Sequence, residues 1–122
     1  MNKIFNELPW HDAIIHSVFI DRNSPGENDS ICIKITWPTG ENSLVFFQNC
    51  YSAILNLNFG IVAPESILSA ECLEESDEIQ YIREKWSKHG ISINKLRQFR
   101  IKTNSTNGLI EIFSSDVEIK AD

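Results

Sequence analysis

The fold is decided by the stretch Ile31-Cys32-Ile33-Lys34-Ile35-Thr36-Trp37, in which large apolar side chains alternate with small or polar ones. Successive side chains of a strand point to opposite faces, so this period of two predicts a β-strand with one buried face. Turn-forming segments flank it at residues 23–29 and 38–42. Beyond these turns lie two more apolar segments, residues 13–22 and 43–49. Three strands joined by short connections predict an antiparallel meander.

A second alternating pattern lies near the C-terminus. Residues 96–103 place Phe99 and Ile101 on one face, and the turn-forming pair Asn107-Gly108 follows. Residues 109–113 return as a partner strand, with a bulge expected at residues 114–116 before the strand continues at residues 117–119. This end of the chain is therefore expected to form a hairpin that completes the sheet.

Between these two regions the sequence predicts one helix. Ser76 is suited to cap its N-terminus, and Ile79, Ile82 and Trp86 recur at helical spacing to form one apolar stripe. Gly90 is suited to the left-handed residue that ends a helix. We expect one main α-helix over about residues 77–89, packed on one face of the sheet.

The intervening residues 50–73 leave alternatives open. Residues 53–59 fit a strand or a short helix, and residues 67–73 fit a short strand. The predicted fold class is α+β: an antiparallel sheet of about five to seven strands, built from the N-terminal meander and the C-terminal hairpin, against one main helix. A chain of 122 residues with 42% hydrophobic content is expected to form a single domain, residues 1–122, with a sufficient core.

Composition excludes several classes of protein. Apolar runs are far shorter than the roughly 20 residues of a membrane span, and the N-terminus lacks the apolar core of a signal peptide, so a cytoplasmic protein without membrane contact is expected. Cys32, Cys50 and Cys72 contain no Cys-x-x-Cys pair, which argues against a disulfide framework and a metal site, and no motif indicates a cofactor. The net charge of −6 disfavours binding to nucleic acid.

Charge is unevenly distributed along the chain. Residues 65–78 hold six acids and no base, whereas residues 83–102 hold seven bases and one acid. One explanation is a solvated surface whose two halves attract each other. The other is an acidic face, centred on Glu71, Glu74, Glu75 and Glu78, that recognises a basic partner.

The only dense group of catalytically capable residues is Trp10-His11-Asp12, with His16 shortly after. A histidine beside a carboxylate suits a general base with its orienting acid, but sequence neighbours on a strand point to opposite faces. His11 and Asp12 therefore pair only if a turn separates them, and a metal site made of His11 and His16 on one strand is disfavoured. The simpler alternative is that Asp12 turns the chain into the first strand while Trp10 packs beneath it.

A resemblance is carried by short motifs at both ends of the chain. These motifs are Leu8-Pro9-Trp10-His11-Asp12-Ala13, Phe99-Arg100-Ile101-Lys102-Thr103-Asn104-Ser105, Gly108-Leu109-Ile110-Glu111-Ile112 and Asp116-Val117-Glu118-Ile119. They resemble a group of small uncharacterised bacterial β-rich domains in which a His-Asp pair leads into a meander. Some of those domains look like immunity proteins of toxin systems. The resemblance implies a bacterial binding protein rather than an enzyme, and it assigns no functional residue.

The leading functional hypothesis is a non-enzymatic protein-binding module, including an immunity-like inhibitor of a basic bacterial toxin. Its partner-binding residues would be Trp10, His11, Asp12, Glu71, Glu74, Glu75 and Glu78. One alternative is a small enzyme or ligand-binding protein that uses residues 10–12 and His16. Another is a structural subunit that forms a homodimer through a free sheet edge or face.

Overall fold

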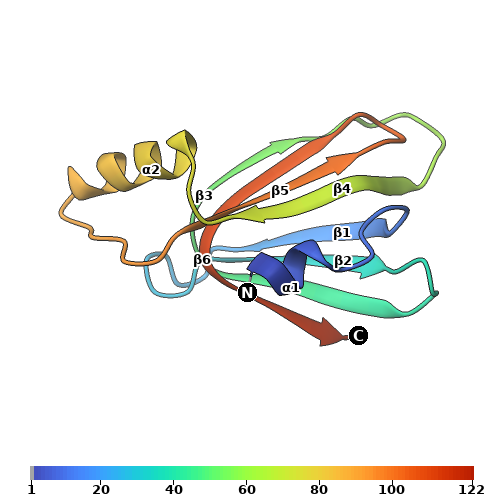
Figure 1. The fold of residues 1–122 in the computed structure, drawn as a ribbon, viewed down its shortest axis with the longest axis horizontal. Helices are drawn as coiled ribbons and strands as arrows, with labels where there is room; N and C mark the ends of the chain where they lie inside the picture. Colours follow the sequence, from blue (N-terminus) through green and yellow to red (C-terminus); the bar gives the residue numbers. More distant parts are fainter. Residues whose placement is uncertain (1) are drawn as a thin grey trace.

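The protein is a barrel of six antiparallel strands with two short helices, seen in a computed structural model that describes residues 2–122 (Figure 1). The elements are α1 (Asn2–Asn6), β1 (Ile14–Asp21), β2 (Ser30–Thr36), β3 (Asn42–Asn56), β4 (Glu65–Leu73), α2 (Asp77–Ser87), β5 (Arg97–Thr103) and β6 (Leu109–Ala121). Around the barrel the strands follow the order β1-β2-β3-β6-β5-β4.

The predicted meander is confirmed. β2 lies between β1 and β3, and Ile33 pairs with Val18 on one side and with Val45 on the other. Ile31, Ile33 and Ile35 are buried, as their alternation predicts. The C-terminal hairpin β5–β6 is also confirmed, and it joins the meander because β6 pairs with β3.

β3 and β6 are long strands that belong to both halves of the barrel. The first half of β3 pairs with β2 and β6, whereas the half beyond Cys50 pairs with β6 alone. The bulge expected at residues 114–116 lies instead on β3, where Cys50 and Ser52 face the consecutive residues Ser114 and Phe113. A bulge bends and twists its strand. β3 and β6 both bend at one end of the barrel (Figure 1).

The barrel closes through a short seam between β1 and β4. Ile14 pairs with Ser66 and Ile15 with Glu65. Two backbone hydrogen bonds extend the seam: the Asp12 amide donates to the Ile67 carbonyl at 2.9 Å, and the Ile67 amide donates to the Ala13 carbonyl at 2.8 Å. β1 and β4 separate beyond these residues.

Five aromatic rings in contact lie in the barrel core, among buried aliphatic side chains. Their centroids lie 4.9 Å apart for Phe47 and Phe99, 5.1 Å for Phe99 and Phe5, 4.6 Å for Phe5 and Trp10, and 4.9 Å for Trp10 and Trp37. The prediction of one main helix is wrong, because α1 is a second helix and its Phe5 lies in the centre of this core. Five helical residues are too few to show a 3.6-residue period, so α1 could not be recognised from the sequence.

The residues at the two ends of α2 are those predicted from the sequence, although the helix ends at Ser87, before residue 89. The Ser76 hydroxyl accepts a hydrogen bond from the Ile79 amide at 3.0 Å. Gly90 adopts a φ of +75°, a left-handed conformation that favours glycine.

The apolar stripe of α2 packs on the outside of one end of the barrel, where Figure 1 shows the helix projecting. Ile79 and Ile82 are buried in a small cluster with Ile93, Leu96 and Phe113, separate from the main core. Trp86 is half-buried at its edge. The expectation that this helix covers a sheet face is therefore only partly met, because its apolar stripe packs in this separate cluster and not on the main core.

Replacing Phe5 by alanine should lower the free energy of unfolding by about 3–5 kcal/mol, because the change leaves a cavity among the core rings. Urea denaturation measures this loss. Phe59→Ala is the matched control, since the Phe59 side chain is 85% exposed, and it should change stability by less than about 0.5 kcal/mol. An equally small loss for Phe5→Ala would show that α1 is not part of the core.

Candidate functional site

Trp10 is a core residue in the structure. Its ring is buried between Phe5 and Trp37, and its indole Nε1 donates to the Phe5 carbonyl at 2.7 Å. This hydrogen bond satisfies the one polar atom of the side chain. Trp10 thus packs beneath the chain that enters β1, as the simpler sequence interpretation had it.

His11 and Asp12 are brought together on the surface by a turn. Asp12 has a φ of +70°, and its Oδ1 lies 3.6 Å from Nε2 of His11. The other ring nitrogen of His11 lies 3.1 Å from the Leu68 carbonyl oxygen. Both side chains are about two-thirds exposed (66% and 65%), and neither lines the two cavities described in this structure. At 3.6 Å the two groups form an ion pair rather than the hydrogen bond of a general base with its orienting acid, and neither of the two cavities adjoins them.

His16 belongs to a different polar group. Its Nε2 lies 2.7 Å from the Thr36 hydroxyl, which donates to Asn42 Oδ1 at 2.6 Å. His11 and His16 therefore contact different polar groups, the Leu68 carbonyl and the Thr36 hydroxyl. Within residues 2–122, no three His, Cys, Asp or Glu side chains are arranged to hold a metal ion.

The predicted acidic residues lie on one surface with arginines of the same chain, and we call this the glutamate–arginine surface. It consists of Glu71, Glu74, Glu75, Glu78, Arg83, Arg97, Arg100 and Glu111. Arg100 stands at its centre, with Nη1 3.6 Å from Glu71 and Nη2 3.7 Å from both Glu78 and Glu111. The acidic segment, residues 65–78, therefore forms ion pairs with the basic segment, residues 83–102, in the fold.

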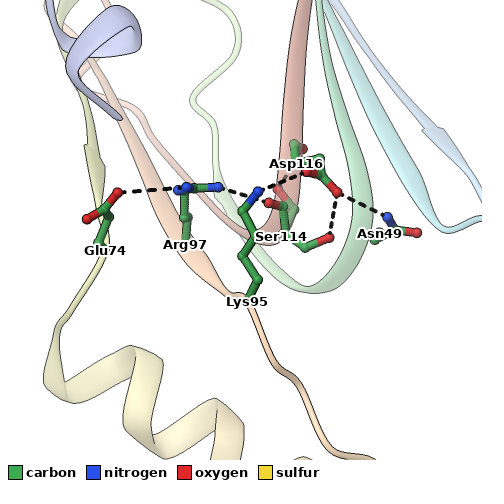
Figure 2. Close-up of polar contacts among 7 residues, drawn as sticks. Asn49, Glu74, Lys95, Arg97, Ser114 and Asp116 are labelled. Carbon is green, nitrogen blue, oxygen red and sulfur yellow. Dashed lines mark hydrogen bonds and ion pairs between the residues drawn. The ribbon is translucent and has the colours of Figure 1, made fainter. Parts of the chain in front are cut away.

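Arg97 extends this surface toward β6. Its Nη2 lies 3.7 Å from Glu74, and its Nη1 donates to the Ser115 carbonyl at 3.2 Å (Figure 2). Its Nε is buried without a hydrogen-bond partner among the described residues. Arg83 lies 3.9 Å from Glu75, which also accepts a hydrogen bond from Gln80.

A buried glutamine connects α2 to the glutamate–arginine surface. The Ser76 hydroxyl donates to Gln98 Oε1 at 2.7 Å, and Gln98 Nε2 donates to Glu111 at 2.5 Å. In the alternation of β5, Gln98 shares a face with Arg100, opposite the face of Phe99 and Ile101. Gln98 is fully buried nonetheless, because the N-terminal end of α2 covers it.

Asp116 connects the bend of β6 with the bulge of β3 and with the segment before β5 through polar contacts. It accepts hydrogen bonds from Ser115 at 3.0 Å and from Asn49 at 3.4 Å, and Lys95 Nζ lies 3.5 Å away (Figure 2). Partial burial opposes ionisation of this carboxyl, but the two hydrogen bonds and the ammonium of Lys95 outweigh it and lower the pKa of Asp116.

A cleft of about 650 Å³ opens where β3 leaves β2, and we call it the fork cleft. Its wall includes Ile20 of β1, Tyr51 of β3, Trp86 of α2 and Ile91. Cys50 also lines it, and burial raises the pKa of this thiol to about 12, so the thiolate that a nucleophile requires is disfavoured. The sequence did not reveal the cleft, because its residues come from four separate segments.

The comparisons with known proteins assign no family. No protein-family model matches the chain, and no curated protein is significantly similar to it. Among residues 2–122, neither helix has the length and apolar character needed to cross a membrane.

The variant Asp116→Asn should be less stable than the parent protein at pH 7, by about 1 kcal/mol or less because the side chain is partly exposed. A carboxyl with a lowered pKa contributes stability above the usual aspartate pKa of about 3.9, and the contribution is lost as the pH falls below it. Denaturant unfolding of both proteins at several pH values should therefore show a difference that disappears in acid. A difference that is constant with pH would contradict the ionic role.

Proposed function

We propose that the chain is a non-enzymatic protein-binding module of the cytoplasm whose partner presents a basic surface, as an immunity-like inhibitor of a basic bacterial toxin does. The observation that carries this proposal is the charge excess of the glutamate–arginine surface. Five carboxylates there share three guanidinium groups. The surface therefore stays negative after its internal ion pairs are formed, in a molecule whose net charge is −6.

The internal ion pairs leave these carboxylates available. Glu71, Glu74 and Glu78 are about half exposed and Glu75 more so, and their contacts with arginine measure 3.6–3.9 Å. The arginine side chains are more buried, at 13–28% exposed, so they stay in place while the carboxylates keep a side open to solvent. A partner's lysine or arginine can therefore share these carboxylates with the internal arginines, and the negative field speeds its approach.

An enzyme or ligand-binding protein built on Trp10, His11, Asp12 and His16 has less support. Trp10 is buried, His16 is bonded to Thr36, and the exposed pair of His11 and Asp12 lines neither of the two cavities. His11 and Asp12 remain predicted contact residues for a protein partner. They lie beside β4, the strand that carries Glu71.

Affinity capture from a lysate of the source organism, with salt titration and mass spectrometry, tests the proposal. Wild-type protein should retain a partner of basic isoelectric point that elutes as salt rises, since screening weakens such contacts. The variant with Glu71, Glu74, Glu75 and Glu78 all changed to Gln should lose at least about 90% of that capture, equivalent to 1.4 kcal/mol or more.

The matched control changes Glu7, Glu27, Glu41 and Glu118 to Gln, which alters the net charge equally at exposed positions elsewhere. Capture should survive in this control. Loss of capture in both variants would indicate a nonspecific charge effect, and full capture by the first variant would exclude the glutamate–arginine surface. If the captured partner is a toxin, co-expression of the chain should restore growth of cells that produce it.

A further inference from the structure

We infer that the fork cleft binds a small organic cation, a protonated amine carried on an aromatic or other apolar body. The volume of the cleft, about 650 Å³, lies within the range of small-molecule sites, roughly 300–1,000 Å³. A basic protein partner is not required, because no residue of the glutamate–arginine surface lines the cleft. The chemistry of the cleft wall selects the ligand.

Large apolar side chains line the cleft without being fully buried. Ile20 and Ile91 are 47% and 43% exposed, and Tyr51 and Trp86 are partly buried. The two rings pack against the small cluster that contains Ile79, so they are held in place before a ligand arrives. A ligand with an apolar body would shield these four side chains from water, and this burial favours its binding.

Ser30 supplies a polar group on the cleft wall. The residue is 4% exposed and lines the cleft, and its hydroxyl has no hydrogen-bond partner within residues 2–122. Over the same residues, Arg97 Nε is the one enclosed side-chain N or O atom without a partner, so the Ser30 hydroxyl is accessible rather than enclosed. A nearly buried hydroxyl without a partner is costly, and an ammonium group in the cleft would donate a hydrogen bond to it.

The charged residues of the cleft wall are Arg22, Glu27 and Asp29. Nε of Arg22 lies 2.8 Å from Oδ1 of Asp29, whose Oδ2 accepts a hydrogen bond from the Gly26 amide at 3.0 Å. The charges of Arg22 and Asp29 therefore compensate each other. The Glu27 carboxylate is exposed and forms no ion pair in the part of the chain that the structure describes. The cleft thus carries one uncompensated negative charge, which attracts a cation and repels phosphates and carboxylates.

The aromatic rings of the wall also favour a cation, because the face of an indole or phenol ring attracts an ammonium group. Lys85 shows this attraction, since its Nζ lies 5.2 Å from the ring centroid of Trp86. Lys85 does not line the cleft, so its ammonium leaves the cleft side of Trp86 and the ring of Tyr51 free. A neutral apolar molecule would use the walls alone, whereas an amine with an apolar body would use the walls, the rings and Glu27 together.

An NMR titration of the isotope-labelled full chain tests the inference, with phenethylamine as the probe. Phenethyl alcohol and hydrocinnamate are the comparison compounds, because they carry the same ring and are neutral and anionic. The amine should bind with a dissociation constant of about 1 mM. The alcohol should bind at least about fivefold more weakly, and the acid more weakly still. Equally tight binding of either comparison compound, or no binding of the amine up to about 10 mM, would overturn the inference.

The indole N–H resonances of the three tryptophans show where the amine binds. Trp86 lines the cleft. The Trp10 indole donates to the Phe5 carbonyl at 2.7 Å, and the Trp37 indole donates to the Ser43 hydroxyl at 2.8 Å, both in the core. The Trp86 resonance should therefore move during the titration while the two core resonances stay in place. A stationary Trp86 resonance would place the binding site elsewhere and contradict the inference.

The variant Glu27→Gln tests the charge of the cleft. Glu27 is exposed, so the variant should fold, and its preference for the amine over the alcohol should fall below about twofold. Glu41→Gln is the matched control, because Glu41 is also exposed but does not line the cleft, and this variant should keep the wild-type preference. An unchanged preference in Glu27→Gln, or an equal loss in both variants, would show that the cleft does not select the cation.

Discussion

The pairing of β3 with β6 is the interaction on which the rest of the structure depends. It runs from Ser43 opposite Ala121 to Asn56 opposite Leu109 and passes through the one place where both strands bend. On one side of the bend β3 also pairs with β2, and on the other side β6 also pairs with β5. Because each strand takes part in both halves, the bulge at Cys50–Ser52 fixes how the halves face each other and so shapes the aromatic core between them.

The same bend shapes two features of the molecular surface. Where β3 leaves β2, the fork cleft opens and the bare edge of β3 begins. Where β6 leaves β5, Asp116 and the Ser115 carbonyl bind Lys95 and Arg97 (Figure 2). The glutamate–arginine surface then continues across β5 to α2, because Gln98 is bonded to both Ser76 and Glu111. The charged glutamate–arginine surface and the uncharged edge of β3 therefore both begin at the same bend of the sheet.

The sequence predicted those parts of the fold that depend on local periodicity. The alternation around Ile33 and around Ile101 located β2 and β5, and Ser76 and Gly90 located the ends of α2 closely. It could not reveal α1, whose five residues acquire their structure from the packing of Phe5 against Phe99. It also could not separate the two interpretations of the acidic segment, since pairing between Glu71 and Arg100 depends on the register of β4 with β5. The unpaired half of β3 was hidden for the same reason, because an edge is a property of the whole barrel.

The contact between Phe5 and Phe99 has a consequence for how the chain folds during synthesis. Phe5 cannot pack against Phe99, 94 positions later, and the second half of β3 cannot pair with β6, until β5 and β6 have been synthesised. Such distant contacts slow folding, since a long loop must close before they stabilise anything. Until then, residues 52–56 of β3 have no strand partner on either side, and their uncharged, mostly apolar side chains remain exposed in the nascent chain.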